Sequence, residues 1–292
     1  MTGSTDVGAE PSISVVIPTR DRPAALQRCL HALSSQTVSE QLEVIVVDDG
    51  SVDGDRLAEA VSEWPATRLL RQSPSGPAAA RNRGARAAKG SFICFTDDDC
   101  EPRADWVERL VTALRDQADA VGGRTIGTPT KAVVRASELI ARAPALAGGD
   151  NTLVFTPSNN LACRAEVISA VPFDERFPTA AGEDRNWCER LFQSGRVLRY
   201  EPSAVLLHHH DARIGSFFRQ QVRYGRGAFR FRRLSSQPRS LERPRFYAQL
   251  VQRGFAEGPV AGVLVCAAQL ATAAGFGSEW LRTQRRRRFS AV

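Results

Sequence analysis

The chain has 292 residues, of which 42% are hydrophobic and 24% are charged. This composition supplies a core for one large α/β domain with an appendage, and it confines the expected disorder to the ends, chiefly residues 1–10. The six cysteines are scattered without a CxxC pair. That spacing argues against a disulfide framework or a zinc site and favours a reducing compartment. The start of the chain lacks a basic stretch followed by a long apolar run, so we expect a protein that is not secreted.

The net charge of +7 is distributed unevenly along the chain. Residues 1–210 carry 23 Lys and Arg against 28 Asp and Glu, whereas residues 211–292 carry 16 against 4, a balance of +12. The C-terminal region is therefore a physically separate, basic segment. Nucleic acid, anionic lipid and an acidic partner all fit such a segment, and charge alone does not choose among them.

Strand-like and helix-like segments alternate from the start of the chain. Short apolar, β-branched runs predict strands, and apolar residues three or four positions apart predict helices. The expected strands are residues 12–17, 42–47, 67–70, 91–96, 159–163 and 197–207, and the expected helices are residues 24–36, 56–64, 78–89, 106–117 and 184–193. The Ala-rich residues 131–149 are assigned to helix and loop. This repetition predicts a mostly parallel sheet covered by helices on both faces.

Three consecutive carboxylates, Asp97, Asp98 and Asp99, follow the apolar strand at residues 91–96. Adjacent carboxylates repel one another, so they must be exposed or share a hard cation such as Mg²⁺ or Mn²⁺. Because alternate side chains of a strand share a face, Asp97 and Asp99 are the pair expected to hold one metal ion. The alternative is a solvated acidic turn, or a helix cap ahead of Pro102.

Other polar residues are expected at the same edge of the sheet. The second strand ends in Asp48 and Asp49, where a carboxylate can accept hydrogen bonds from a ribose or a base, or can simply cap the strand through an Asx turn. The first strand leads into Thr19 and Arg20, and the loop at residues 73–77 leads to Arg81 at the start of a helix, where cations can hold a base or a diphosphate.

Five blocks in this order resemble a family-2 glycosyltransferase, one of the inverting nucleotide-sugar enzymes with a GT-A fold: SVVIPTRDRP, LEVIVVDDGSVDG, GPAAARNRGARAAKG, FTDDDCEP and AGEDRNWCERL. The resemblance covers about residues 12–210 and rests on the order and spacing of the blocks. It implies that the nucleotide is bound by Pro18, Thr19, Arg20 and Asp49, with Arg81 and Asp98 also assigned to the nucleotide-sugar. It makes Asp97 and Asp99 the DxD motif, with Asp99 as the direct ligand of Mn²⁺ or Mg²⁺. The family often has an aromatic residue where Arg20 stands, and a guanidinium can stack on a base as well.

The block containing Glu183 and Asp184 opens a predicted helix. Acidic residues in a first helical turn also favour the helix dipole, which is the structural alternative. The resemblance places this pair beneath the acceptor and makes Asp184 the general base, with Glu183 orienting the acceptor or the helix. Arg185 is expected to keep the Asp184 carboxylate ionised.

Two further motifs follow the last predicted strand. Of three consecutive histidines, alternation places His208 and His210 on one face, and the resemblance implies that a histidine here reaches the metal ion; the alternative is an exposed strand end. Gln220 and Arg223, followed by Tyr224, are similar to the QxxRW signature of membrane polysaccharide synthases. On a helix these two residues share one side and can meet the acceptor or the diphosphate.

Residues 260–276 form an apolar run with arginines on both sides. A membrane span needs about 20 residues, and positive charge on both flanks argues against crossing. We expect an in-plane helix or a re-entrant hairpin held by anionic lipid; the alternative is an ordinary helix that packs on the domain or forms a homodimer. The aromatic residues nearby form no base-stacking module, so nucleic acid is not an expected partner.

Together these patterns predict a metal-dependent, inverting transfer of a sugar from a UDP-, GDP- or dTDP-sugar to the hydroxyl of a glycan or lipid-linked acceptor. We expect a catalytic domain at residues 11–212, with a nucleotide-binding half (11–100) and an acceptor half (101–212), and a basic helical region at residues 213–292. The expected location is cytoplasmic, at the inner face of the plasma membrane, in the synthesis of cell-envelope or other glycoconjugates. The alternatives are a nucleotidyltransferase, which would normally show a Gly-rich loop near the first strand, and a catalytically idle membrane scaffold.

Overall fold

The computed structural model describes residues 12–116, 118–127, 131–142, 155–209, 213–235 and 244–289. The expected N-terminal disorder at residues 1–10 falls outside these ranges. The strands are β1 (Ile13–Thr19), β2 (Leu42–Asp48), β3 (Thr67–Arg71), β4 (Phe92–Phe95), β5 (Cys100–Pro102), β6 (Ala120–Gly127), β7 (Leu161–Arg164) and β8 (Leu198–His208).

The helices of the catalytic part and of the C-terminal region follow in chain order. They are α1 (Pro23–Ser34), α2 (Gly54–Ser62), α3 (Pro77–Ala87), α4 (Trp106–Arg115), α5 (Ala132–Arg142), α6 (Ala165–Ala170), α7 (Glu183–Gln193), α8 (Ile214–Leu234), α9 (Pro244–Ala256) and α10 (Pro259–Phe289). Two short 3-10 helices, Ser39–Gln41 and Ser158–Asn160, precede β2 and β7. The predicted α/β class and most of the predicted elements are therefore confirmed.

All eight strands join one sheet in the order β3-β2-β1-β4-β7-β6-β8-β5. The strands from β3 to β4 are parallel, and β6 is parallel to β8, whereas β7 runs antiparallel to both of its neighbours and β5 antiparallel to β8. The sheet is thus mixed. Its parallel N-terminal half brings the ends of β1 and β2 to the same edge, where Thr19 lies in register with Asp48.

Three elements did not follow from the sequence pattern. β6 contains Gly122, Gly123 and Gly127, which interrupt the apolar run that predicts a strand. β5 has only 3 residues and α6 only 6, too few to show a period. The strand expected at residues 159–163 begins later, because a 3-10 turn occupies its start.

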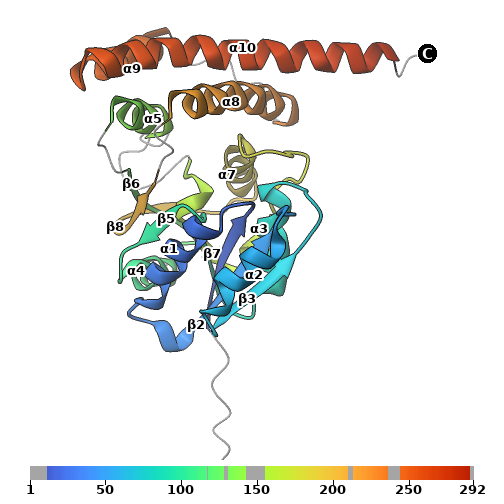
Figure 1. Cartoon of the computed structure of the whole chain (residues 1–292), viewed down its shortest axis with the longest axis vertical. Helices are drawn as coiled ribbons and strands as arrows, with labels where there is room; N and C mark the ends of the chain where they lie inside the picture. Colours follow the sequence, from blue (N-terminus) through green and yellow to red (C-terminus); the bar gives the residue numbers. More distant parts are fainter. Residues whose placement is uncertain are drawn as a thin grey trace, which may run out of the picture.

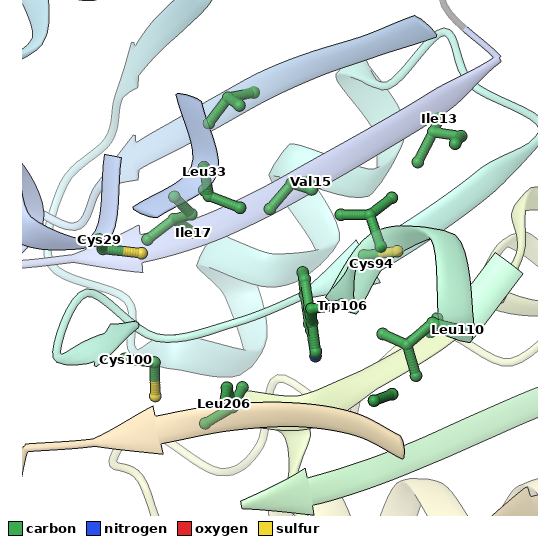
Figure 2. Close-up of a cluster of buried hydrophobic side chains, with 14 of the residues drawn as sticks. Ile13, Val15, Ile17, Cys29, Leu33, Cys94, Cys100, Trp106, Leu110 and Leu206 are labelled. Carbon is green, nitrogen blue, oxygen red and sulfur yellow. The ribbon is translucent and has the colours of Figure 1, made fainter. Parts of the chain in front are cut away.

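Helices cover both faces of the sheet (Figure 1). The side chains of the strands alternate between these two faces. Val15 and Ile17 pack in one cluster with α1, α2 and α4, whereas Val16 and Phe95 pack in another with α3, α6 and α7. Figure 2 shows the first cluster, in which Trp106 lies among the side chains of β1, α1 and α4. This two-sided burial makes the sheet a rigid support for the residues at its edge.

The C-terminal helices form a further layer beyond the sheet (Figure 1), in which α8 lies between the catalytic part and the long α10. The crossing of α8 and α10 depends on glycines. A Cβ on Gly225 would lie 1.9 Å from the carbonyl oxygen of Thr272, and one on Gly275 would lie 2.1 Å from that of Val222. Only glycine, whose side chain is a single hydrogen atom, allows the two helix backbones to approach so closely at these positions.

α10 is one continuous helix, so the re-entrant hairpin expected for residues 260–276 is wrong. One side of it is buried, at Ala261, Leu264, Val265 and Ala268. Of the described residues, Pro259–Arg285 forms a helix long and apolar enough to cross a membrane, and 33% of its most apolar window is buried inside the protein. The helix therefore packs on the domain and still presents an apolar side to the exterior.

Candidate active site

A cavity of about 730 Å³ is lined by both the edge of the sheet and the C-terminal helices. Every predicted site residue in the described parts of the chain lines it: Pro18, Thr19, Arg20, Asp49, Arg81, Asp97, Asp98, Asp99, Glu183, Asp184, His208, Gln220 and Arg223. His210 lies outside the described residues. The predicted residues thus gather at one place, and their individual roles depend on the contacts that each side chain makes.

The carboxylate of Asp49 holds the loop that leads into α3. Its Oδ1 accepts hydrogen bonds from Gln72 Nε2 and from the backbone N–H of Ser75, both at 2.8 Å, and its Oδ2 accepts one from the N–H of Gly76 at 2.8 Å. Gly76 has a φ of +92° and lies against Pro178, so the loop needs a glycine here. A carboxylate has about four acceptor positions, which leaves room at Asp49 for one hydrogen bond from a ligand.

Asp48, rather than Asp49, makes the Asx turn that was the structural alternative at this strand end. Its Oδ1 accepts a hydrogen bond from the N–H of Ser51 at 2.8 Å, and its Oδ2 lies 3.2 Å from Arg71 Nε. Asp48 is fully buried and does not line the cavity. Of the two neighbouring carboxylates, only Asp49 is placed to meet a ligand.

Asp97, Asp98 and Asp99 lie in the turn after β4 and not in the strand itself. The strand alternation by which Asp97 and Asp99 were expected to share a face therefore does not apply. Asp97 Oδ1 accepts a hydrogen bond from Arg81 Nη2 at 2.6 Å, whereas Asp99 Oδ2 accepts one from Arg22 Nη1 at 2.9 Å. The two carboxylates of the predicted metal pair are thus held by different arginines.

Asp98 is the buried member of the triplet, with 4% of its surface exposed. It accepts hydrogen bonds from Thr19 Oγ1 at 2.7 Å and from Arg22 Nη1 at 3.1 Å. Burial and the neighbouring Asp99 raise the pKa of Asp98 to about 7, against the opposing effects of Arg22 and Thr19. Asp98 therefore ties the end of β1 to the turn that carries its neighbours.

Asp99 lies next to His208, as the predicted metal set requires. His208 Nε2 is 3.2 Å from Asp99 Oδ1, and donor atoms of Asp99, Cys100 and His208 all lie within 4.8 Å of one another. Burial alone would raise the pKa of Asp99, but the hydrogen bond and charge of His208, together with Arg22, lower it to about 2. The same pairing raises the pKa of His208 despite its burial. An ionised carboxylate beside an imidazole suits a divalent cation.

The second histidine of the triplet faces elsewhere. His209 Nε2 lies 2.9 Å from Glu101 Oε1, and His209 does not line the cavity. This difference from His208 agrees with the predicted alternation of side chains at the end of β8. The adjacent His210 lies outside the described residues, so its place beside His208 in the metal set stays a prediction.

Arg22 is the site residue that the sequence analysis did not single out. It bridges Asp98 and Asp99, whereas the predicted Arg20 lies 3.5 Å from Asp21; both side chains are about half exposed. Both arginines occur in the same short segment between β1 and α1, so the sequence contained the right residue type. Which of the two turns toward the aspartates is set by contacts with a turn that lies more than seventy residues later.

Arg81 connects the two acidic clusters of the cavity. It is 3% exposed, and its Nη2 donates to Asp97 while its Nη1 lies 3.5 Å from Glu183 Oε1. Despite the desolvation that burial causes, the surrounding carboxylates raise the pKa of Arg81. A cation in this place fixes the distance between the turn after β4 and the start of α7.

Glu183 and Asp184 form the first turn of α7. Glu183 is buried, its Oε2 accepts a hydrogen bond from the N–H of Ala181 at 2.8 Å, and burial together with the charge of Asp184 raises its pKa to about 7. Burial also raises the pKa of Asp184, although Arg185 and Arg81 oppose it. Arg185 therefore does not dominate as expected, and a carboxylate with a raised pKa is a better proton acceptor.

The opposite wall of the cavity, here called the helix wall, is formed by residues of α5, α8, α9 and α10: Ile140, Ala141, Gln220, Gln221, Arg223, Tyr224, Ala228, Phe231, Arg232, Phe246, Tyr247, Leu250, Gln269 and Thr272. Gln220 Nε2 donates to Tyr224 Oη at 2.8 Å. The sequence motif located Gln220 and Arg223, but the contributions of α5, α9 and α10 have no local signal, because they depend on how the helices pack.

Comparison with known proteins places this arrangement in a family. The model of a family described as glycosyl transferase family 2 matches residues 14–162. Pre-mycofactocin glycosyltransferase of Mycobacterium tuberculosis is 32% identical over 230 residues, 74% of this chain and 46% of that protein, so the match spans about half of the relative's length. Glycosyltransferase AglE of Haloferax volcanii is 30% identical over 229 residues, 74% of this chain and 73% of that protein.

Two solved structures share the fold at low sequence identity. The mannosyltransferase PcManGT from Pyrobaculum calidifontis, in complex with GDP-Man and Mn²⁺, superposes with a TM-score of 0.61 at 20% identity, covering 91% of this chain and 76% of the other. S. aureus TarS, in complex with UDP, gives a TM-score of 0.55 at 17% identity, covering 84% and 72%. The predicted GT-A fold is thereby confirmed. The family match over half of the chain, the similarity to AglE and the shared fold lead to one conclusion: this chain belongs to glycosyl transferase family 2.

Proposed function

We propose that the protein transfers a sugar from a nucleoside-diphosphate donor to an acceptor hydroxyl, with inversion at the anomeric carbon and with the help of a divalent cation. The observation that carries this proposal is that the carboxylates at the edge of the sheet and the Glu183–Asp184 pair line one cavity. Relatives named as glycosyltransferases, and two proteins of the same fold, one a mannosyltransferase bound to GDP-Man and Mn²⁺ and the other bound to UDP, support it.

The nucleotide is proposed to bind at the ends of β1 and β2. Pro18 and Thr19 end β1 and Arg20 follows it, and Asp49 offers its remaining acceptor position to a ribose hydroxyl or a base N–H. Thr19 already donates its hydroxyl to Asp98, so it acts by fixing the turn beneath the nucleotide. Arg81 and Asp97 lie nearby and are assigned to the diphosphate-sugar.

The donor atoms at Asp99 and His208 fit a divalent cation such as Mn²⁺ or Mg²⁺. Asp97, which lies outside that cluster and pairs with Arg81, would reach the same cation only by exchanging this partner. A cation held there would offset the charge that develops on the departing nucleoside diphosphate. The protein itself supplies Asp99 in its ionised form. Arg22 donates a hydrogen bond to Asp99 Oδ2, while His208 lies beside Asp99 Oδ1. His208 would hold such a cation through a neutral imidazole nitrogen.

Asp184 is proposed as the general base. It accepts the proton of the acceptor hydroxyl as that oxygen attacks the anomeric carbon, and the nucleoside diphosphate leaves from the opposite face. Glu183 is the positioning residue, because its carboxylate is occupied by the N–H of Ala181 and lies close to Arg81. Arg81 thereby sets the distance between the base and the Asp97 turn.

We place the protein at the inner face of a membrane, where it serves cell-envelope or glycoconjugate synthesis. The support is the apolar outer side of α9 and α10, with exposed Phe255, Val260, Val263, Leu270 and Leu281, beside the basic end of the chain. Residues 11–212 then act as the catalytic domain and residues 213–292 as the region that meets lipid. Burial of the same outer side in a homodimer is the competing arrangement.

The proposal is tested by separating donor binding from transfer with Asp184→Asn. The variant should bind UDP or GDP with Mn²⁺ as the wild type does in calorimetry, while transfer falls in kcat by about 10²-fold or more, the scale of general-base catalysis. Asp105→Asn is the matched control, because Asp105 is an ion-paired, partly exposed aspartate outside the cavity. NMR of the product tests inversion. Full turnover by Asp184→Asn would assign the base elsewhere, with Glu183 as the next candidate.

A further inference from the structure

The helix wall contains a glutamine in an unusual state. Gln221, on α8, lines the cavity and has 0% of its surface exposed. Neither its Nε2 nor its Oε1 has a hydrogen-bond partner among the described residues. A buried amide normally forms hydrogen bonds, because losing water without replacement is costly. Gln221 therefore keeps one donor and one acceptor group unused beside the cavity.

Gln36 shows what the same side chain does when its role is structural. It is 4% exposed, and its Nε2 donates to the carbonyl oxygens of Ala32 and Arg103 while its Oε1 accepts from the N–H of Val107. Both glutamines are thus buried, but only Gln36 is satisfied within the protein. Burial by itself does not explain why Gln221 carries an amide.

The surroundings of Gln221 define what can meet it. Phe217, one turn earlier on α8, is buried with Leu250 of α9 in the same apolar cluster, and Gly225, one turn later, packs against the backbone of α10. The helix wall also includes the aromatic rings of Phe246 and Tyr247 and the cations of Arg223 and Arg232. Because the residues packed around Gln221 itself are apolar, this position suits an apolar group with a neutral polar function and disfavours a charged group that would lose its water there.

We propose that Gln221 is an acceptor-binding residue, and that the acceptor presents to it a neutral hydroxyl or amide on an otherwise apolar group. A hydroxyl or an amide both donates and accepts, which matches the two unused groups of Gln221. This inference rests on the proposed glycosyl transfer and names the class of acceptor as a neutral amphiphile. The adjacent Gln220 is less suited, since its amide already donates to Tyr224.

The first test compares the thermal unfolding of two matched variants of the full chain. Gln221→Met should raise the unfolding temperature, because it removes two unsatisfied polar groups while keeping the side-chain volume. Gln36→Met should lower it, because three hydrogen bonds are lost at a similarly buried position. A drop for Gln221→Met as large as that for Gln36→Met would make Gln221 structural and would overturn the inference.

The second test measures binding by calorimetry in the presence of Mn²⁺ and UDP or GDP. Octyl β-D-glucoside, below its micellar concentration, should bind the wild type at least tenfold more tightly than methyl β-D-glucoside, which lacks the apolar chain, and than octyl phosphate, which is charged. Gln221→Met should lose about tenfold of the octyl glucoside affinity, because one hydrogen-bonded group of the ligand loses its partner. Octyl glucoside that adsorbs on the exposed side of α10 should do so equally in the wild type and in Gln221→Met. This contribution therefore cancels when the two affinities are compared.

The two tests separate this inference from the function on which it rests. If the wild type binds no nucleoside diphosphate, the proposed function fails. If the nucleotide binds to both proteins but Gln221→Met leaves the octyl glucoside affinity unchanged, only the role of Gln221 is wrong. Preferential binding of octyl phosphate would overturn the neutral class of acceptor.

Discussion

The carboxylates on the sheet side of the cavity and the amide of Gln221 on the helix side differ in how completely their hydrogen bonds are satisfied. On the sheet side, Asp49, Asp97, Asp98 and Asp99 each accept hydrogen bonds from other side chains or from backbone N–H groups. On the helix side, Gln221 is buried with its amide unused, and the helices approach one another through glycine and apolar contacts. The sheet side is thus organised before a ligand arrives, whereas the helix side lacks a partner that a ligand can supply.

This difference has a physical origin. The edge of a sheet that is covered on both faces cannot shift without disturbing the core, so carboxylates fixed there can recognise a ligand part that is always the same. Packed helices can present varied side chains at little cost to the fold, and that suits a part of the ligand that differs between enzymes. We therefore assign the nucleotide to the sheet side and the acceptor to the helix side.

We expect the largest effect, a loss of nucleotide affinity, from removing the divalent cation. This experiment tests the sheet side of the comparison. The affinity for UDP or GDP should fall by roughly a hundredfold or more in EDTA relative to Mn²⁺, because a cation at Asp99 and His208 contributes several kcal/mol toward the diphosphate charge. Calorimetry in both conditions measures this. Equal affinities would remove the cation from the sheet side and leave its arginines, Arg20, Arg22 and Arg81, to offset the charge of the diphosphate.

The second effect concerns the outer side of the helix layer. Replacing Arg285, Arg286, Arg287 and Arg288 by Ser should weaken binding to anionic vesicles by up to about 4 kcal/mol at low salt, since each arginine near the surface supplies ~1 kcal/mol. Binding to neutral vesicles should not change, which makes these the control. If flotation shows that the wild type ignores anionic vesicles, the exposed side of α10 belongs to an interface between protein chains.

A third, smaller effect tests whether glycines hold the helix wall together. Gly225→Ala places a methyl group against Thr272 and should lower the free energy of unfolding by about 1–3 kcal/mol, as overpacking does. Gly277→Ala is the matched control, because a Cβ there meets no atom within 4 Å. It should leave stability unchanged or raise it by up to about 1 kcal/mol through helix propensity. Denaturant unfolding measures the free energy of unfolding of both variants. Equal values would contradict the close packing of α8 on α10.

The smallest effect is a displacement of the pH profile. Asp184 acts as a base only when deprotonated, and burial raises its pKa, so kcat/KM should rise with pH over a range above that of an ordinary aspartate. Arg185 lowers this pKa, and removing it in Arg185→Gln should move the acidic limb to still higher pH, with less activity at a given acid pH. A shift toward lower pH, or none, would exclude Arg185 as a neighbour that affects the base.

Much of the sheet side could be predicted from the sequence. Apolar runs identified β1, β2 and β4, and because the carboxyl ends of parallel strands meet at one edge, Thr19, Asp49 and the three aspartates were expected together. The helix side was predicted only through the motif at Gln220 and Arg223. Its other residues lie on α5, α8, α9 and α10. The order of these helices in the sequence does not show which of their faces pack against one another.

By itself, therefore, the sequence determined the fold class, the strands whose ends carry polar residues and most of the polar side chains on the sheet side of the cavity. These follow from local periodicity and from the connectivity of the chain. Only the tertiary structure decided that Arg22 rather than Arg20 holds the aspartates, that Asp48 closes a turn while Asp49 faces the cavity, and that α10 is continuous with one side exposed. It also decided that Gln221 is buried without a hydrogen-bond partner in the described parts of the chain. Each of these depends on burial and on contacts between residues far apart in the chain, and neither quantity is encoded in any short stretch of sequence.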